Sequence, residues 1–332
     1  MASGSQQLRY NKSMEEHMDI KTIIQKKSEV ITKYGPWTAH NIQLRDDIYT
    51  IAPEIIGDEV KLRRIVQCVL DLAGGSVEGL RILDLACLEG LYAIEFARHK
   101  AACLGIEGRE ANIEKARFAK QVLLLDNLEF TQDDVRNLTI EKHGQFDVVL
   151  CLGILYHFDA PDVFSFVERV AEVCRKICIV DTRITLRPKT SYVYNNNAYF
   201  GTRGEEHDPR DSKERKIAKL WASLDNNENF WLTRSTLYNL LSHVGFTSVY
   251  ECNIPAEPEK PIDRITLVAI KGTVGHLLST PQMAGRPADK MPEHSHRENS
   301  LAAESLRQIS RILPPSVRKV GKTLIGRDNK LT

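Results

Sequence analysis

Two acidic side chains stand near the ends of short apolar runs, where a nucleotide-type ligand can reach them. Asp84 lies near the end of the run 81–85, and Glu107 ends the next such run. Between them, Ala86 and Gly90 frame a tight turn that opens a helix, and a helix amino terminus attracts a carboxylate. A carboxylate placed as Glu107 is can accept hydrogen bonds from both hydroxyls of an adenosine ribose. These residues predict a site for an adenosine joined to a charged amino acid.

Two further segments complete a pattern of motifs. Asp134 and Val135 follow a third apolar run, and a fourth run, 146–152, leads into Tyr156 and His157. In this order and spacing, the four segments resemble the cofactor motifs of class I S-adenosylmethionine-dependent methyltransferases. The resemblance covers about residues 76–272, and Ala86 stands where the family motif has its first glycine.

The resemblance implies a Rossmann-like fold, an S-adenosylmethionine cofactor and a set of cofactor-binding residues. In the family, the acidic residue before a branched apolar one binds the adenine amino group, and the segment after the fourth strand runs beneath the methionine part. Carried onto this chain, the implied cofactor-binding residues are Asp84, Ala86, Gly90, Glu107, Asp134, Val135, Cys151, Leu152 and Tyr156.

The main rival is a nicotinamide-binding Rossmann domain, but the turn from Asp84 to Gly90 lacks the three-glycine fingerprint of that class. We therefore expect methyl transfer to a small-molecule acceptor, with a hydroxyl of a natural product or a glycan favoured. Segments 152–157, 229–233 and 245–246 resemble the tRNA wobble-uridine carboxymethyl transferases and their small-molecule relatives. A tRNA wobble-base modifying transferase and a non-methylating S-adenosylmethionine-binding cyclase or regulator are the alternatives.

Methyl transfer to a hydroxyl requires removal of the acceptor proton, and histidine is suited to this near neutral pH. His157 follows the fourth strand, close to where the transferred methyl is expected, so it is the first candidate for a general base. Helix capping, packing or orientation of the cofactor is the alternative role. His40, in the amino-terminal segment, is the second candidate, and a solvated loop position is its alternative.

Aromatic and polar residues supply the candidates for acceptor binding. They lie in an amino-terminal hairpin and in an insertion after the fifth strand, at the sheet edge where open α/β folds bind ligands. The predicted substrate-binding residues are Trp37, Tyr194, Tyr199, His207 and Trp231. Glu206 and His207, together with Asp181, are a weaker candidate for a divalent metal site. The alternative is a loop held by salt bridges, because adjacent side chains on an extended chain point apart. We therefore predict no metal.

The elements needed to position these residues follow from the pattern of apolar runs. We expect strands at 81–85, 102–107, 128–132, 146–152 and 176–181, separated by helices, which indicates a doubly wound parallel sheet. Two final strands, 248–253 and 264–271, form a reversed pair. Helices are expected at 13–33, 58–72 and 234–244, and a hairpin at 37–51.

Four parts of the chain are expected. Residues 1–75 form helices and a lid hairpin, and 76–272 form the cofactor-binding domain, whose insertion 183–230 caps the substrate. A linker, 273–300, precedes a basic amphipathic tail, 301–332. Contact of this tail with an anionic membrane surface is one prediction, and docking on the domain or on the second subunit of a homodimer is the alternative.

Composition limits the partners and the compartment. The 45 Lys and Arg residues against 44 Asp and Glu give a formal net charge of +1. This balance argues against a broad phosphate-binding face, so DNA is excluded as a partner and RNA is disfavoured. Seven cysteines, mostly in apolar runs, indicate reduced thiols, and no apolar run approaches the ~20 residues that span a bilayer. We expect a cytoplasmic protein.

Overall fold

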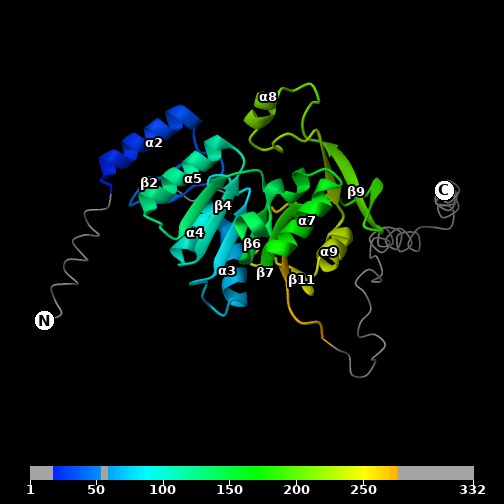
Figure 1. Cartoon of the computed structure of the whole chain (residues 1–332). Coiled ribbons are helices and arrows are strands. Elements are labelled where there is room, and N and C mark those ends of the chain that lie inside the picture. The colour runs from blue at the N-terminus through cyan, green and yellow to red at the C-terminus, as the bar shows by residue number, and fades with distance from the viewer. Residues whose placement is uncertain (1–17, 54–58, 276–332) are drawn as a thin grey trace, which may run out of the picture. The chain divides into compact units, whose positions relative to one another are not determined.

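The computed structural model describes residues 18–53 and 59–275 (Figure 1). The predictions for the linker beyond residue 275, for the basic tail 301–332 and for the helix start at 13–17 lie outside the described residues. Within the described ranges, no helix is long and apolar enough to cross a membrane.

A seven-stranded sheet forms the centre of the fold. Its spatial order is β11-β12-β7-β6-β3-β4-β5, and the five strands from β7 to β5 run parallel. The prediction of a Rossmann-like methyltransferase fold is confirmed; within the final pair, β12 carries the reversal, since it is antiparallel to both β7 and β11. The strands are β3 (Arg81–Leu85), β4 (Ala102–Glu107), β5 (Leu128–Gln132), β6 (Phe146–Leu152), β7 (Cys174–Arg183), β11 (Ser248–Glu251) and β12 (Arg264–Ile270).

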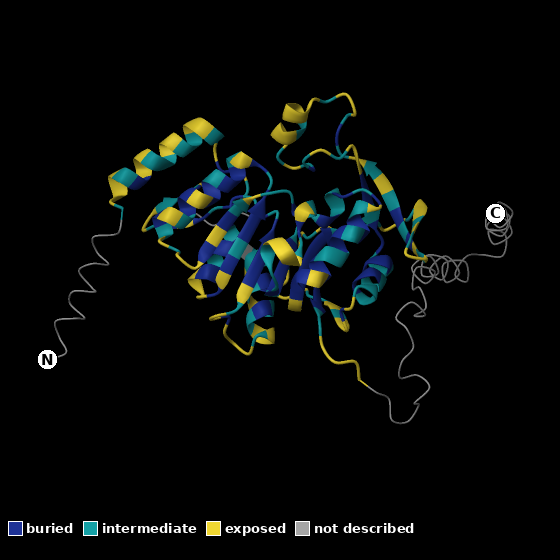
Figure 2. Cartoon of the chain, viewed as in Figure 1, coloured by how far each residue is buried: buried dark blue, intermediate teal, exposed yellow. Residues whose placement is uncertain are grey.

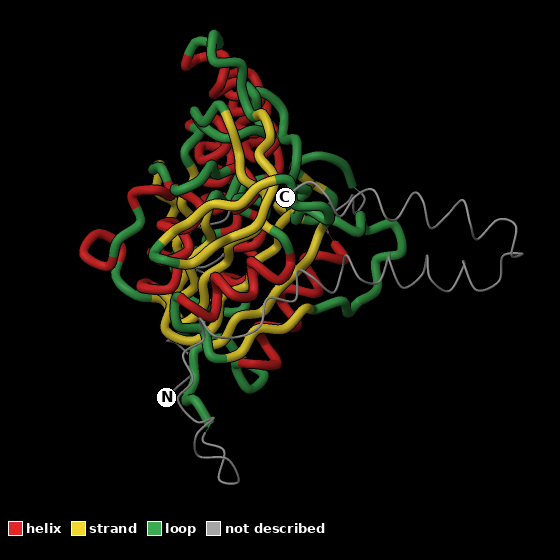
Figure 3. The backbone as a smooth tube through the Cα atoms, turned by 90° about the vertical axis from the view of Figure 1, so that its right-hand side faces the viewer, coloured by secondary structure: helices red, strands yellow, loops and turns green. Residues whose placement is uncertain are grey.

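Helices cover both faces of this sheet, as Figure 3 shows. Side chains alternate between the faces: Leu83 and Val149 belong to the core cluster shared with α7 and α9, whereas Ile82 and Val148 belong to the cluster shared with α3, α4 and α5. The central strands are therefore buried on both sides (Figure 2) and read as continuous apolar runs. The helices are α3 (Glu59–Leu72), α4 (Leu91–Arg98), α5 (Glu110–Leu123), α7 (Asp162–Val173) and α9 (Arg234–His243).

The amino-terminal segment contributes one helix and one hairpin. Helix α2 (Ile20–Tyr34) begins after Asp19, whose carboxylate accepts a hydrogen bond from Thr22 N at 2.9 Å. Residues 18 and 19 are therefore not helical, because Asp19 caps the helix rather than continuing it. The predicted hairpin is present as β1 (Gln43–Arg45) and β2 (Ile48–Tyr49).

The insertion after β7 has a small sheet of its own. Strands β8 (Thr190–Tyr194), β9 (Asn197–Glu205) and β10 (Glu228–Leu232) pair in the antiparallel order β10-β9-β8. Helix α8 (Lys213–Ala218) lies between β9 and β10. Short turns complete the domain at η1 (Val135–Asn137), α6 (Ile140–His143) and η2 (Leu155–His157). Because β10 also contacts η2, the insertion lies against the end of β6.

Candidate functional site

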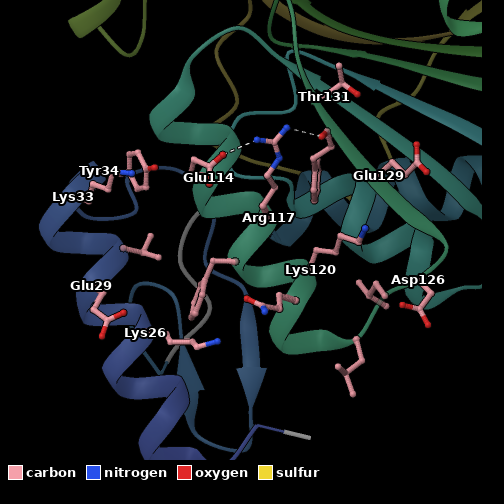
Figure 4. A pocket seen from close by; sticks show the side chains of 16 residues that line it. Lys26, Glu29, Lys33, Tyr34, Glu114, Arg117, Lys120, Asp126, Glu129 and Thr131 are labelled. Carbon is pink, nitrogen blue, oxygen red and sulfur yellow. Dashed lines mark hydrogen bonds and ion pairs between the residues drawn. The ribbon is translucent and has the colours of Figure 1, made fainter. Parts of the chain in front are cut away.

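Two large cavities stand out among the described residues, and the first of them carries little chemistry. It measures about 880 Å³ and lies in the groove between α2 and α5 (Figure 4). Its lining mixes basic and acidic side chains, and Arg117 donates to Glu114 at 2.6 Å and to the Phe130 carbonyl at 3.0 Å. The exposed, mixed-charge lining gives this groove no buried titratable group to aim at a ligand.

The second cavity lies at the carboxyl ends of the parallel strands, where α/β folds bind ligands. Its volume is about 640 Å³. It gathers side chains from the amino-terminal segment, from the ends of four strands and from the insertion. Among its lining residues are Ala39, His40, Lys61, Asp84, Ala86, Leu88, Glu107, Arg109, Val135, Leu152, Tyr156, His157, Arg183, Trp221, Leu224 and Arg264.

Asp84 is a buried carboxylate that faces this cavity. It accepts a hydrogen bond from Ala93 N, at 3.2 Å, in the first turn of α4. Burial raises its pKa from 3.8 to about 7, with Glu107 adding to the rise and Lys61 opposing it. A ligand ammonium group beside Asp84 would favour the ionised carboxylate. Asp84 is thus suited to the amino acid end of the cofactor.

We expect Asp84→Asn to stabilise the protein in a pH-dependent way. Between about pH 4 and 7 the folded chain holds a proton on Asp84 that the unfolded chain has released, so this contribution to stability falls as pH rises. The variant should therefore gain up to about 4 kcal/mol over wild type at pH 8 and little below pH 4. Urea unfolding at pH 4, 6 and 8 measures this difference.

Asp147→Asn serves as the control of opposite sign. Burial acts to raise the pKa of Asp147, but the hydrogen bond from Arg81 N and the ion pair with Lys176 hold it below its usual value. Its replacement should destabilise the protein at pH 8. Equal unfolding curves for Asp84→Asn and wild type at all three pH values would contradict the assignment of a raised pKa to a buried Asp84 carboxylate.

The turn between β3 and α4 is left-handed at three positions. Ala86 has φ +52°, Leu88 +48° and Gly90 +87°. A Cβ at Gly90 would lie 2.6 Å from Phe130 Cζ, so glycine is required there by space as well as by φ. Ala86 stands where the family motif has glycine, and the left-handed conformation costs alanine more free energy than it costs glycine. The NH groups of Leu88 and Leu91 already donate, to Glu107 Oε2 and His40 Nδ1, so what the turn offers an anionic group is close approach to the positive end of α4.

Ala86→Gly is expected to raise the free energy of unfolding by about 1 kcal/mol, because it removes the cost of a left-handed alanine. Affinity for S-adenosylhomocysteine should be unchanged or tighter. Thermal unfolding and ligand titration check both expectations. Ala119→Gly, within α5, is the matched control and should destabilise the protein instead. Loss of stability in Ala86→Gly would show that the methyl group, not the backbone conformation, decides at this position.

Glu107 ends β4 and is 2% exposed. Its carboxylate accepts hydrogen bonds from Leu88 N at 3.0 Å and from Arg109 N at 2.8 Å. Burial raises its pKa, although these backbone contacts and the Arg109 charge act against the rise. A carboxylate held in this way retains lone pairs for further donors. Its position at the cavity fits the two ribose hydroxyls predicted for it.

His157 and Glu206 form a pair at the opposite side of the cavity. His157 Nδ1 lies 3.0 Å from both carboxylate oxygens of Glu206, and the two side chains are 13% and 6% exposed. Burial acts to raise the pKa of Glu206, but His157, Asn229 and Ser223 N hold it below its usual value. Since the ionised carboxylate only accepts, Nδ1 donates, which leaves Nε2 as the unprotonated nitrogen of the neutral ring.

His40 is buried beside the turn instead of standing in a solvated loop. Its Nδ1 accepts a hydrogen bond from Leu91 N at 3.3 Å, and its ring packs edge-on against Tyr92 at 5.8 Å between centroids. Glu89 fixes the backbone here, since it accepts from Thr38 N, Ala39 N and His40 N. His40 therefore lines the cavity at the amino terminus of α4, and its role as an alternative base stays a prediction.

The other predicted cofactor residues divide into two groups. Val135, Leu152 and Tyr156 line the cavity, in agreement with their predicted place. Cys151 is buried within β6, and Asp134 caps η1 while its carboxylate binds Arg136 Nε at 2.9 Å; neither lines the cavity. The Arg136 guanidinium therefore binds the carboxylate that was expected to contact adenine, and the sequence motif gives no sign of this ion pair.

None of the five predicted acceptor-binding residues lines the cavity, and the four in the insertion make other contacts instead. Tyr194 and Tyr199 stack on Phe164, with centroids 5.1 and 4.8 Å apart. Trp37 packs against Phe118 under the lid segment. Likewise, His207 Nε2 lies 2.8 Å from the Ser223 carbonyl, and Trp231 flanks Tyr156 at 6.0 Å from outside the lining.

The candidate metal ligands also separate. Glu206 faces His157, His207 faces the insertion backbone, and Asp181 binds Arg264 at 2.6 Å and Thr266 at 2.7 Å. In the part of the chain that the structure describes, no three His, Cys, Asp or Glu side chains gather in a way that suits a metal ion. Glu206 and Asp181 are instead paired with His157 and Arg264, which is the salt-bridged alternative.

One side of the cavity is closed by a turn whose residues the sequence does not single out. Leu220, Trp221, Ala222, Ser223 and Leu224 all line it, and Arg109 anchors the turn from the end of β4. Nothing in the local sequence marks these residues as part of a site, since the turn is joined to β4 only by contacts over more than a hundred positions. The adjacent Gly108, which allows Leu224 to approach closely, was the available signal.

Comparisons with known proteins find similarity over part of the chain. Residues 82–176 match the family model described as a methyltransferase domain. Ubiquinone biosynthesis O-methyltransferase of Acinetobacter baumannii (strain AYE) is 35% identical over 99 residues, which is 30% of this chain and 41% of that protein. The enzyme of the same name from Psychrobacter cryohalolentis is 32% identical over 122 residues, 36% of this chain and 46% of that protein. The chain thus matches less than half the length of these relatives.

Solved structures share the fold over a longer stretch. The N-terminal domain of EvdMO1, crystallised in the presence of SAH and D-fucose, superposes with a TM-score of 0.60 at 23% identity. The match covers 77% of this chain and 99% of that one. A structure of EvdMO1 gives a TM-score of 0.51 at 21% identity, covering 76% of this chain and 48% of the other.

Proposed function

We propose that this chain, whose residues 82–176 match the methyltransferase-domain family, transfers the methyl group of S-adenosylmethionine to a hydroxyl of a small-molecule acceptor. One observation carries the proposal. A single cavity is lined by the carboxylates Asp84 and Glu107 and by the ring of His157, whose Nδ1 is held by Glu206. It therefore offers both a place for the cofactor and a base for the acceptor.

The residues at the end of β3 and β4 fit the cofactor. Asp84 would hold the ammonium of the methionine part, and the left-handed turn from Ala86 to Gly90 would bring its carboxylate close to the amino terminus of α4. Glu107 would accept hydrogen bonds from the ribose hydroxyls. When bound, S-adenosylmethionine supplies an electrophilic sulfonium methyl, and the remaining chemistry belongs to residues of this chain.

The proton of the acceptor hydroxyl is assigned to His157. Nε2 would take the proton of the acceptor hydroxyl as its oxygen is methylated, and the ring would then carry a positive charge. Glu206 accepts from Nδ1 at 3.0 Å, so it fixes the tautomer and stabilises the charged ring. This pairing is the reason for preferring His157 to His40, whose Nδ1 accepts a hydrogen bond from a backbone NH group.

The acceptor is proposed to be a natural product or a glycan-type molecule. Tyr156 and Trp221 provide flat apolar faces on the cavity wall, while Arg183 and Arg264, which pair with Asp263 and Asp181, add guanidinium groups to the lining. This mixture suits a polar ring. The related EvdMO1 domain was crystallised with D-fucose, which adds weight to a sugar as the acceptor class. A cavity of about 640 Å³ is in the range of small-molecule sites.

An acceptor screen tests the proposal. The purified chain is incubated with S-adenosylmethionine carrying a trideuteromethyl group, together with sugars, glycosides, phenols or a cellular metabolite extract. Mass spectrometry should find one deuterated methyl group on an acceptor oxygen and a matching amount of S-adenosylhomocysteine. Binding of the cofactor without label transfer to any component would instead favour a regulator or cyclase, and label on a nucleobase of added tRNA would favour the RNA alternative.

A further inference from the structure

Arg109 is buried, yet among the residues that the structure describes no carboxylate accepts from its guanidinium. Its side chain donates to backbone carbonyls at the end of α8 and in the turn that follows it. Nε reaches the Ile217 carbonyl at 2.9 Å, and Nη2 reaches those of Lys219, Ala222 and Ser223 at 3.0, 2.8 and 3.0 Å. We call residues 217–224 the strap. Only a planar group with several fixed donors can join these carbonyls, and lysine lacks that geometry.

The strap continues directly to the proposed base. Ser223, whose carbonyl accepts from Arg109, donates its backbone NH to Glu206 Oε2 at 2.9 Å. Glu206 in turn holds His157 Nδ1 at 3.0 Å. Three consecutive hydrogen bonds thus join the Arg109 guanidinium to the imidazole ring. Just beyond the strap, Asn226 Nδ2 donates to the His157 carbonyl at 2.9 Å.

The same arginine belongs to the proposed ribose site. Arg109 N donates to Glu107 Oε1 at 2.8 Å, and Gly108 separates the two residues. The strap also packs on this segment, because a Cβ at Gly108 would lie 2.5 Å from Leu224 Cδ1. Glu107 ends β4, whereas His157 lies in η2, which follows β6. The strap therefore connects the proposed cofactor part of the cavity with the proposed acceptor part.

Other contacts reach single residues of the strap: His207 Nε2 lies 2.8 Å from the Ser223 carbonyl, and Lys219 Nζ donates to Asp211 at 2.7 Å. Arg109 instead joins four carbonyls of the strap, and its loss would release all four contacts at once. Helix α8 ends at Ala218, and the next strand, β10, begins at Glu228. The carbonyls that Arg109 satisfies would lose their charged donor, and the Ser223 NH would lose its fixed direction toward Glu206. Because Glu206 fixes the imidazole, a change at Arg109 is expected to reach His157 although the two side chains do not touch.

We propose that Arg109 is a positioning residue, which sets the tautomer and orientation of His157 through the strap and Glu206 and links them to the cofactor site. This inference rests on the proposed function, in which His157 is the base. It assigns no contact with the acceptor to Arg109. A small displacement of a reacting group can cost roughly 100-fold in rate, so the effect of losing the link should be measurable.

Histidine tautomers measured by NMR test the link without any acceptor. The full chain is labelled with ¹⁵N-histidine, and the His157 signals are assigned by their loss in His157→Ala. Wild type should show one tautomer with the proton on Nδ1. Arg109→Gln should show both tautomers, together with roughly a 10- to 100-fold lower turnover on the identified acceptor and a smaller change in KM. Arg203→Gln is the matched control.

Arg203 lies in the same insertion and pairs with Asp159 and Glu228, at 3.0 and 2.9 Å, but does not contact the strap. Its variant should keep the wild-type His157 signals. If Arg109→Gln does not fold, Arg109→Lys replaces it, and faster hydrogen exchange at the Ser223 amide is the second measurement. Wild-type tautomers with wild-type Ser223 exchange in either folded variant would overturn the inference.

Failure of the inference is distinguishable from failure of the proposed function. If the chain transfers no methyl group, the proposed function fails, while the tautomer measurement still decides whether Arg109 orients His157. If transfer occurs and depends on His157, but Arg109→Gln changes neither the tautomer nor the turnover, only the inference fails.

Discussion

Replacement of His157 by alanine is expected to lower the turnover of methyl transfer by ~10²- to 10⁴-fold, because the acceptor hydroxyl loses its general base. Affinity for S-adenosylhomocysteine should remain nearly unchanged, since the proposed cofactor contacts come from Asp84 and Glu107. A general base acts only in its unprotonated form, so the acidic limb of the wild-type pH profile that reports this base should be absent from the variant.

Single-turnover transfer measured across pH, with the acceptor found by the screen, checks this expectation. His99→Ala is a suitable control, because His99 also pairs with a glutamate, Glu95, at 3.4 Å but lies on the far end of α4. A purely structural role of His157 makes a different prediction: the melting temperature and the cofactor affinity would fall together. A variant that keeps the wild-type rate, or the same acidic limb, would remove His157 from the mechanism and make His40 the next residue to test.

The second large effect is expected at Glu107. Glu107→Ala should weaken the binding of S-adenosylmethionine by ~1 to 3 kcal/mol, because two ribose hydroxyls lose a charged acceptor. Calorimetric titration measures the change as a higher Kd. Part of the loss arises from Leu88 N and Arg109 N, which both donate to this carboxylate. Glu107→Gln keeps one acceptor oxygen and should lie between the alanine variant and wild type.

Glu129→Ala, at an exposed position of the neighbouring strand β5, controls for a general effect of removing a carboxylate. Its affinity should equal that of wild type. Unchanged affinity in a folded Glu107→Ala protein would be incompatible with the ribose assignment, even if the cofactor binds elsewhere in the cavity.

The sequence was sufficient for the main sheet because its strands are buried on both faces. The bounds predicted for β3, β4, β5 and β6 agree with the structure, since each is a short apolar run closed by a turn or a polar residue. Strand β7 is longer than expected, Cys174–Arg183 instead of 176–181, because its polar ends still pair with neighbouring strands.

The insertion was harder to predict because its elements depend on one another. Strand β9 alternates small, polar and aromatic residues without a clear apolar face, and its pairing with β8 and β10 supplies the order. Tyr194 and Tyr199 were expected at the acceptor because aromatic residues often line ligand sites. In the structure they pack on Phe164, which gives the small sheet its own apolar contacts.

The candidate site was predicted where its residues are close in sequence and missed where they are distant. Asp84 and Glu107 follow from the motif around each strand end. Glu206 was considered only as a weak metal ligand, because its partner His157 lies 49 positions away. The four carbonyls bound by Arg109 are 108 to 114 positions from it, and backbone acceptors leave no mark in the sequence.

Titration of S-adenosylhomocysteine into the wild-type chain tests the central claim most directly, with NAD as the competing dinucleotide. We predict saturable binding of S-adenosylhomocysteine at one site per chain, and no measurable binding of NAD, because the turn after β3 lacks the three glycines that admit a dinucleotide pyrophosphate. Absence of S-adenosylhomocysteine binding to the folded chain, or tighter binding of NAD, would contradict the assignment of the cavity.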